Sequence, residues 1–511
     1  MELPSQRVGT LPGVASSRLL ALALAGILAG CAANPIGAPL GDLRGAESGP
    51  PTLEVAVVAG DDLTALPEAT VVVDGAALRP DAAGAVEVPW RDGPLPVEVS
   101  APGFHPAATT LDEYPPGGVL EFRLEPVVLD GRVQTPNGFP LPGAVVELGA
   151  SRDVTNDEGA FVLERAEPGT VVVTRPGYVE REIPWNGDED RLDVLAEPVA
   201  VHALRVGPDA AADPQRWQAL LALADGTGID ALVVEVKDDR GVVFHDTEVE
   251  RAHEIGAVEV RYDLDAVVED LDDHGLYGIA RVAVFQDPFL AAAEPEHAVV
   301  DEATGAPWRS AAGHAWLDPS DPGSYEYAIS LAEEACRRGF DEIQFDYVSY
   351  PFGGDVSTAV FDGGYTQEVR IDSVLAFLER ATSVLHPLGC AVGTTILGIT
   401  LESSTDEGVG QRPGPLSRVV DVISPMLYTT NYGSGWRGFD DPNLHGPEIV
   451  DGALAAGLRE LEGHGTLRPW LQTWTIGADG ILAVETVAEE RVGGWMLWST
   501  DSTYDPAALP P

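Results

Sequence analysis

Residues 339–351 read GFDEIQFDYVSYP, and this stretch decides the fold. Apolar residues at positions 343 and 345 alternate with polar residues at 342, 344 and 346, as the period of a β-strand requires. A strand with one apolar and one polar face fits a (β/α)8 barrel, because helices cover the outside and strand ends carry the active site. We therefore predict that residues 200–511 form such a barrel, arranged to place Asp346.

From about residue 200 the chain alternates strand-like and helix-like segments, which predicts parallel β/α units. Helix-start signals separate the strands; Asp213, for example, is suited to cap a helix that begins at Pro214. With the opening stretch as the fourth strand, the others are expected at residues 229–236, 276–284, 315–317, 391–396, 421–427, 467–472 and 492–498. Eight strands with interposed helices predict a complete TIM barrel.

Two copies of a smaller unit precede the barrel, at residues 51–126 and 127–199. LPEATVVV at 66–73 matches LPGAVVEL at 141–148, and PGF at 102–104 matches PGY at 176–178. Short β-branched runs between Gly and Pro turns predict a small all-β sandwich in each copy. The two copies resemble the carboxypeptidase-regulatory-like (transthyretin-like) module, which implies a spacer; glycan binding is the alternative. The expected fold class is thus multidomain, two β-sandwich modules followed by a TIM barrel.

The N-terminus has the features of an export signal. Arg7 and Arg18 precede an apolar run at 19–29, which is shorter than the roughly 20 residues of a transmembrane helix. Residues 1–30 therefore predict a signal peptide, and the Gly- and Pro-rich residues 31–50 predict a flexible tether. LAGC at 28–31 resembles the bacterial lipobox, which implies a lipid anchor on Cys31 in the cell envelope, at the outer membrane in a Gram-negative host; cleavage elsewhere is the alternative.

The formal charge is −52, from 82 acidic and 30 basic residues. Such a charge repels nucleic acid and anionic lipid surfaces, so neither is an expected partner. We expect a monomer whose partners are a polysaccharide and, through Cys31, the membrane. The other two cysteines, Cys336 and Cys390, are expected as buried free thiols rather than a disulfide, and no cysteine spacing of the metal-binding kind occurs.

Polar residues at the ends of the predicted strands are the candidate site. They are acids, amides and aromatic residues, without a histidine cluster, a nucleophile-elbow serine or a Gly-rich phosphate loop, so we expect no metal and no cofactor. Two carboxyl groups suit cleavage of a glycosidic bond. Asp346 is the first candidate for nucleophile or base, Glu235 for its partner, and Asp287 is a rival proton donor. The expected substrate-binding residues are Lys237, Asp238, Arg281, Asp318, Gln344, Tyr347, Tyr428, Gln472 and Trp498.

Structural roles are the alternative for each of the acids. Asp346 could hold a loop, and Glu235 could form a buried ion pair with Arg281 or Lys237, because a charge inside a barrel needs a partner. An Asp before a proline, as at Asp287, is also a common turn and helix-capping residue.

Five motifs in order resemble a bacterial "putative glycoside hydrolase" TIM-barrel family. They are VVEVKDDRG at 233–241, GIARVAVFQDP at 278–288, WLDP at 316–319, the opening stretch, and SPMLY at 424–428. The resemblance implies a glycosidase-like barrel over roughly residues 200–505 but supplies no substrate. Ser349 stands where the family usually has arginine, which puts an anionic substrate contact or a loop-holding salt bridge in doubt.

The leading hypothesis is an exported, lipid-anchored glycoside hydrolase acting on a polysaccharide. A non-catalytic glycan-binding or envelope scaffold protein is the alternative, and a deacetylase-like hydrolase, which would need a metal, is a third.

Overall fold

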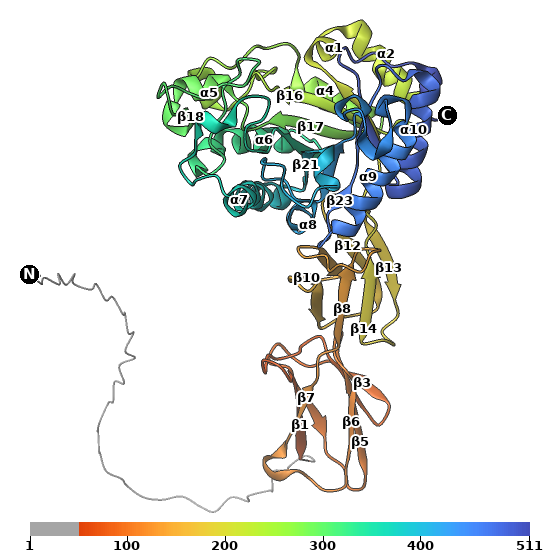
Figure 1. Cartoon of the computed structure of the whole chain (residues 1–511). Coiled ribbons are helices and arrows are strands. Elements are labelled where there is room, and N and C mark those ends of the chain that lie inside the picture. Colours follow the sequence, from red (N-terminus) through yellow and green to blue (C-terminus); the bar gives the residue numbers. More distant parts are fainter. Residues whose placement is uncertain (1–50) are drawn as a thin grey trace, which may run out of the picture. The chain divides into compact units, whose positions relative to one another are not determined.

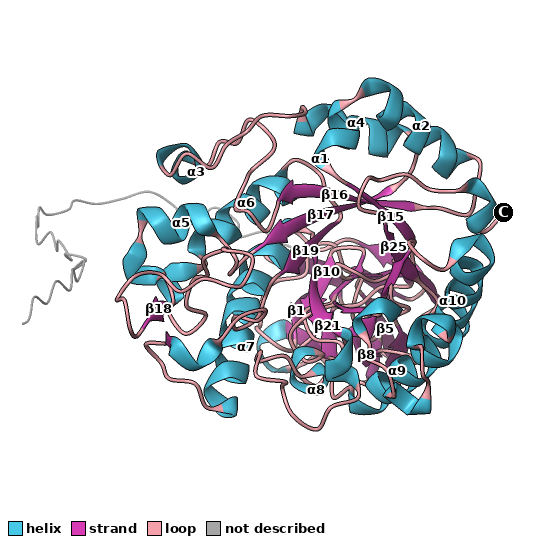
Figure 2. Ribbon diagram, turned by 45° about the horizontal axis from the view of Figure 1, so that its top comes forward, coloured by secondary structure: helices cyan, strands magenta, loops and turns pink. Residues whose placement is uncertain are grey.

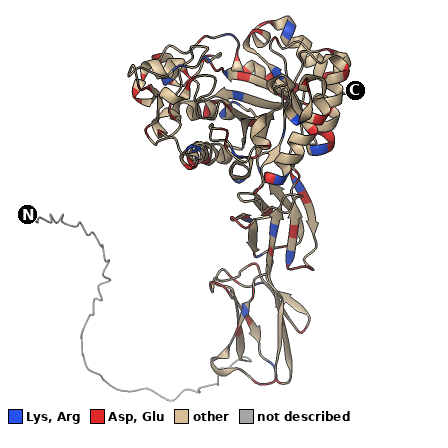
Figure 3. Cartoon of the chain, viewed as in Figure 1, with Lys and Arg blue, Asp and Glu red and all other residues tan. Residues whose placement is uncertain are grey.

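Residues 51–511 are described by a computed structural model. The expected signal peptide, Cys31 and the tether to residue 50 lie outside these described residues. No helix within residues 51–511 combines the length and the apolar character that a membrane span requires. Asp and Glu are spread over the β modules and over the helices and loops of the barrel (Figure 3), so the acidic charge belongs to no single element.

Two β-sheet modules come first (Figure 1), and both have the same strand order. In the first, sheet β4-β1-β7 and sheet β3-β2-β5-β6 share one apolar core; in the second, β11-β8-β14 and β10-β9-β12-β13 do the same. Each strand of the first module therefore has its counterpart in the second. The strands are β1 (Thr52–Ala59), β2 (Thr70–Val73), β3 (Ala76–Leu78), β4 (Ala85–Pro89), β5 (Leu95–Ser100), β6 (Ala107–Leu111), β7 (Val119–Leu124), β8 (Val128–Gln134), β9 (Val145–Leu148), β10 (Ser151–Val154), β11 (Ala160–Glu164), β12 (Gly169–Thr174), β13 (Arg181–Trp185) and β14 (Arg191–Leu195).

A closed parallel barrel follows. Its strands run in the order β21-β19-β17-β16-β15-β25-β24-β22, and β22 pairs back to β21. This confirms the prediction of an eight-stranded parallel barrel. The strands are β15 (His202–Val206), β16 (Ala231–Lys237), β17 (Tyr277–Ala283), β19 (Glu342–Asp346), β21 (Ala391–Leu397), β22 (Val422–Met426), β24 (Trp470–Gln472) and β25 (Trp495–Trp498), with the short β23 (Thr466–Leu467) beside β22 and a small ribbon of β18 (Val300–Asp301) and β20 (Ala359–Val360) outside it.

Helices surround the strands, as Figure 2 shows. The polar-in, apolar-out character of the opening stretch is visible at β19, where the Phe345 ring packs 5.0 Å from the ring of Phe377 on α7. Asp213 accepts backbone N–H bonds at the start of α2, as its position predicted. The α-helices are α1 (Pro208–Ala212), α2 (Pro214–Asp225), α3 (Glu250–Glu254), α4 (Leu264–Asp273), α5 (Pro288–Ala293), α6 (Glu326–Arg337), α7 (Gln367–Leu385), α8 (Pro413–Leu416), α9 (Gly446–Glu460) and α10 (Gly477–Val492).

One predicted strand was wrong and one real strand was missed. β15 completes the ring between β16 and β25, whereas residues 315–317 lie in the long connection after β17 and make only isolated bridges. The apolar character of 315–317 has another cause. Trp316 is fully buried against Tyr347 and Phe352, with ring centroids 5.9 and 5.2 Å away, so it anchors the connection rather than a barrel strand.

The expectation of two free thiols was also wrong. Cys336 and Cys390 form a disulfide, with their Cα atoms 6.0 Å apart. Cys336 lies in the last turn of α6 and Cys390 directly precedes β21. Because β19 follows α6 and pairs with β21, these two segments meet at the same end of the barrel, which spacing along the chain does not reveal.

Glu485 on α10 gives the barrel a distinctive pH dependence. It is 4% exposed, and burial raises the pKa of its carboxyl to about 8. The folded protein thus keeps a proton that the unfolded chain releases. Protonated Glu485 therefore contributes its full share of the folding stability below the unfolded pKa, and this stability is lost as pH rises through about 8. We expect Glu485→Gln to flatten the decline in unfolding free energy between pH 5 and 9, a decline of at most about 5 kcal/mol.

Urea denaturation across that pH range measures the effect. Glu490→Gln, on an exposed position of the same helix, is the matched control and should leave the decline unchanged. Parallel profiles for wild type and Glu485→Gln would contradict the assignment.

Candidate active site

A cavity of about 690 Å³ opens at the C-terminal ends of the barrel strands. This volume is in the range of small-molecule sites. Every strand of the ring contributes a lining residue, either from the strand itself or from the loop that directly follows it; for β24 this residue is Trp474. The lining includes Arg205, Arg216, Glu235, Asp238, Asp239, Arg240, Arg281, Asp346, Tyr347, Ser349, Thr395, Tyr428, Trp474, Trp498 and Asp501.

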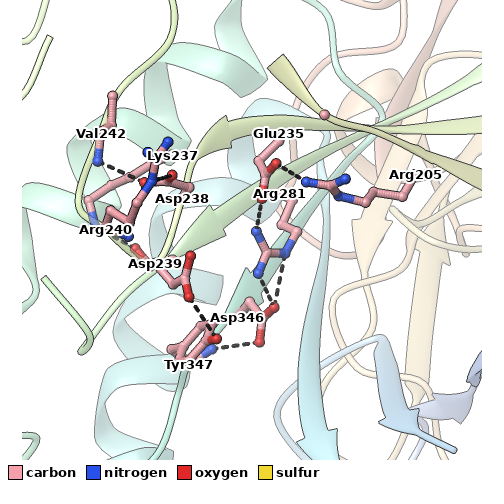
Figure 4. A network of polar contacts seen from close by, with 12 residues as sticks. Arg205, Glu235, Lys237, Asp238, Asp239, Arg240, Val242, Arg281, Asp346 and Tyr347 are labelled. Carbon is pink, nitrogen blue, oxygen red and sulfur yellow. Dashed lines mark hydrogen bonds and ion pairs between the residues drawn. The ribbon is translucent and has the colours of Figure 1, made fainter. Parts of the chain in front are cut away.

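Four buried side chains of alternating charge cross the cavity floor (Figure 4). Arg205, Glu235, Arg281 and Asp346 come from the neighbouring strands β15, β16, β17 and β19, and we call them the charge row. Arg205 pairs with Glu235, Glu235 with Arg281, and Arg281 with Asp346. The last pair is bidentate from the guanidinium, with N–O distances of 2.5 and 2.9 Å to Asp346 Oδ2. Every charge in the row is thus compensated, as burial requires.

The charge row fixes the ionisation of its central arginine. Burial alone lowers the pKa of Arg281, but the carboxylates of Asp346 and Glu235 outweigh it and raise that pKa well above its ordinary value. The Trp498 ring lies 4.6 Å from the Arg205 guanidinium and 5.0 Å from that of Arg281. Cation–π contact with both arginines adds to their stabilisation and holds the indole at the cavity.

Asp346 is held by three neighbouring residues. Arg281 occupies Oδ2, while the Thr395 hydroxyl and the Tyr347 backbone N–H, at 2.7 Å, donate to Oδ1. Charge-assisted bonds of this kind are short and directional, so the carboxyl group is fixed in place. It faces the cavity from the end of β19, where a catalytic residue of a barrel enzyme is expected.

Tyr347 connects two acids of the cavity. Its φ of +54° lies in the left-handed region, which is uncommon for a residue with a large side chain. Its backbone N–H binds Asp346, and its phenol donates to Asp239 Oδ2 at 2.9 Å (Figure 4). Burial and the nearby carboxylates of Asp346 and Asp239 raise the pKa of Tyr347 far above its usual value, so the phenol remains a proton donor in this contact.

Aromatic rings form walls of the cavity. Tyr428 and Trp474 lie with ring centroids 5.1 Å apart, and Phe352 stacks on Tyr347. Burial raises the pKa of Tyr428 well above its ordinary value, so this phenol too stays neutral. Flat aromatic faces suit the C–H faces of a pyranose ring.

Two of the sequence candidates lie away from the cavity. Lys237 and Asp287 have no solvent exposure and pair with each other at 3.0 Å. A β-bulge between Glu235 and Lys237 shifts the register of β16, and the Lys237 ammonium lies 5.9 Å from the Tyr327 ring of α6. Asp287 also accepts the backbone N–H groups that begin α5. Both residues therefore have structural partners, and neither lines the cavity.

Three further candidates are buried hydrogen-bonding residues outside the cavity lining. Asp318 accepts from the backbone N–H of Asp362 and from Ser320. Gln344 accepts from the Trp470 indole inside the barrel, and Gln472 binds the loop that follows β22. Asp238 does line the cavity, but its carboxylate pairs with Arg240 at 2.6 Å and accepts the N–H groups of its own turn. Glu235, Arg281, Asp346, Tyr347, Tyr428 and Trp498 are the candidates that the structure brings together.

Sequence reasoning did not anticipate Arg205. Its signal was the apolar run VHALRV at 201–206, a short strand interrupted by one arginine. Asp239 stands directly after the predicted strand at 229–236, but nothing in the chain order indicates that it meets Tyr347.

The chain belongs to the family described as "Putative glycosyl hydrolase domain", whose model matches residues 203–504. No curated protein matches the chain.

Among solved structures, a hypothetical protein from Ruminiclostridium thermocellum is 33% identical, over 37% of this chain and 96% of that protein, with a TM-score of 0.35. An α-galactosidase from Thermus thermophilus is 13% identical over 81% of this chain and 73% of its own, with a TM-score of 0.39. A chitobiase from Flavobacterium johnsoniae is 12% identical over 78% of this chain, which spans 59% of that enzyme, with a TM-score of 0.38.

Proposed function

We propose that this protein is a glycoside hydrolase that acts on a polysaccharide, with Asp346 as nucleophile or general base. The observation that carries the proposal is the position of Asp346, at the end of β19, facing the cavity and held by donors on both oxygens. Glycosidases use such a carboxylate on one side of the scissile bond and a second carboxyl on the other. The aromatic walls and the family to which residues 203–504 belong support a sugar substrate.

Release of reducing ends tests this function. Residues 32–511, purified without the lipid, are incubated with a panel of polysaccharides that includes bacterial exopolysaccharides. We expect at least one to be cleaved in a reaction that increases in proportion to enzyme concentration. A panel without any cleavage would count against the proposal.

A non-catalytic glycan-binding protein is the second candidate. The favouring observation is that both oxygens of Glu235 are occupied by arginines. Binding of a glycan on an array, with no release of products from that same glycan, would favour this candidate over hydrolysis.

We also propose that the protein is exported, anchored by a lipid on Cys31, and carries its two β modules as transthyretin-like sandwich spacers. The Cys336–Cys390 disulfide supports export, because disulfides persist in oxidising compartments. In each module two sheets share one core, as in a sandwich. In a bacterial host, Cys31→Ser should abolish incorporation of a palmitate probe and release the protein from the membrane fraction. Unchanged labelling would contradict the anchor.

A further inference from the structure

The charge row provides Asp346 but leaves the second carboxyl of the reaction unassigned. A proton donor needs a carboxyl oxygen that can hold a proton and deliver it to the leaving group. Glu235 has one oxygen on Arg205 and the other on Arg281. The carboxylate of Asp238 is bound to Arg240 and to its own turn, and Asp287 lies outside the cavity. Asp209 and Asp501 also line the cavity but are exposed; Asp209 pairs with Arg261, and the hydrogen bond from Ser499 lowers the pKa of Asp501.

Asp239 differs from all these acids. It follows β16, is half-buried and lines the cavity. Its Oδ2 accepts from neutral donors, the Tyr347 phenol at 2.9 Å and the Gln286 amide at 3.2 Å. Within residues 51–511 it has no ion pair with Arg, Lys or His, and its Oδ1 accepts no hydrogen bond and is not among the fully buried polar atoms. Asp239 therefore has one oxygen positioned by neutral donors and one free toward the cavity.

We propose that Asp239 is the proton donor of the hydrolysis in which Asp346 is nucleophile or base; this assignment rests on the proposed function. Tyr347 is the positioning residue. Its backbone N–H binds Asp346 and its phenol binds Asp239, so one residue in a constrained left-handed conformation sets the position of both acids. That double contact explains why a tyrosine occupies a backbone position that disfavours it.

The protonated Asp239 carboxyl gives its proton to the glycosidic oxygen while the bond between that oxygen and the anomeric carbon breaks, and the bonding electron pair leaves with the oxygen as a sugar hydroxyl. Asp346 either attacks the anomeric carbon, forming an ester that water cleaves, or removes a proton from a water that attacks directly. In the first route Asp239 takes its proton back from the water; in the second it is reprotonated from solvent.

Leaving-group dependence tests the assignment. Dinitrophenyl and phenyl glycosides are made from the sugar or oligosaccharide that the wild type releases from its polysaccharide. The dinitrophenolate leaves without protonation, whereas the phenolate requires a proton donor. We expect Asp239→Asn to reduce kcat/KM for the phenyl glycoside by about 10²–10⁴-fold but to leave the dinitrophenyl glycoside within a few-fold of wild type.

Two further variants keep the outcome interpretable. Tyr347→Phe removes the phenol contact and should lower kcat/KM more for the phenyl glycoside than for the dinitrophenyl glycoside, while retaining part of the activity. Glu235→Gln should affect both glycosides equally, because Glu235 holds the charge row. Thermal unfolding of each variant, compared with wild type, checks that the variant is folded. Equal loss for both leaving groups in Asp239→Asn, or leaving-group dependence in Glu235→Gln instead, would overturn the assignment.

The same assay separates two failures. If the wild type cleaves its glycan and Asp239→Asn cleaves both glycosides at the wild-type rate, only the role of Asp239 is refuted. A wild type inactive on every glycan refutes the proposed function, and the assignment with it.

Discussion

Asp346→Asn is expected to reduce hydrolysis of the glycan substrate by roughly 10³–10⁴-fold, because an amide can neither attack the anomeric carbon nor accept a proton from water. Folding should survive the change. Asparagine keeps the shape of the side chain, and Glu235 remains to compensate the buried Arg281. The measurement is kcat/KM for release of reducing ends, made on protein whose thermal unfolding has been compared with wild type.

A control for this variant lies outside the cavity. Asp318→Asn changes a buried aspartate that holds loops and does not line the cavity, so it should alter stability more than turnover. Full activity in Asp346→Asn would remove Asp346 from the chemistry and would leave the glycan-binding alternative as the better account.

Arg281→Met is expected to have a large effect on stability, lowering the free energy of unfolding by about 3–5 kcal/mol. The guanidinium joins Glu235 to Asp346, and its loss leaves the Asp346 carboxylate without an ionic partner in a buried position. Activity should fall as well, because Asp346 Oδ2 is no longer held. Urea denaturation and kcat/KM on the folded fraction measure the two effects.

Lys237→Met is the matched comparison. It breaks another buried ion pair, Lys237–Asp287, and should cost about the same stability, about 3–5 kcal/mol. Since that pair lies away from the cavity, turnover by the folded fraction should stay near wild type. Turnover by the folded fraction that stays near wild type in Arg281→Met as well would show that the charge row contributes only to folding.

The sequence predicted the barrel because most of its strands keep a clear pattern. The alternation in β19 and the apolar runs of β17 and β21 mark strands without help from tertiary structure. β15 was missed because five residues with an arginine near the end give a weak signal. Residues 315–317 were wrongly predicted as a strand because a buried tryptophan in a long connection gives the same local pattern as a strand.

The site was predicted only as far as strand ends determine it. The expectation that functional residues lie at the C-terminal ends of barrel strands located Glu235, Arg281 and Asp346, whose side chains face the cavity. It failed for Lys237, because a β-bulge is a feature of pairing and has no signature in one strand's own sequence. The contact between Tyr347 and Asp239, 108 positions apart, likewise follows from the way β16 and β19 are brought together.

The alternation of the charge row has a consequence for how the cavity meets its environment. Two cations and two anions cancel within the row, although the whole chain carries −52. The floor therefore presents oriented dipoles to a ligand rather than net charge, and no counter-ion must be displaced when an uncharged sugar enters. Dissolved salt screens the exposed acids of the surface but has little influence on compensated charges that are shielded from water.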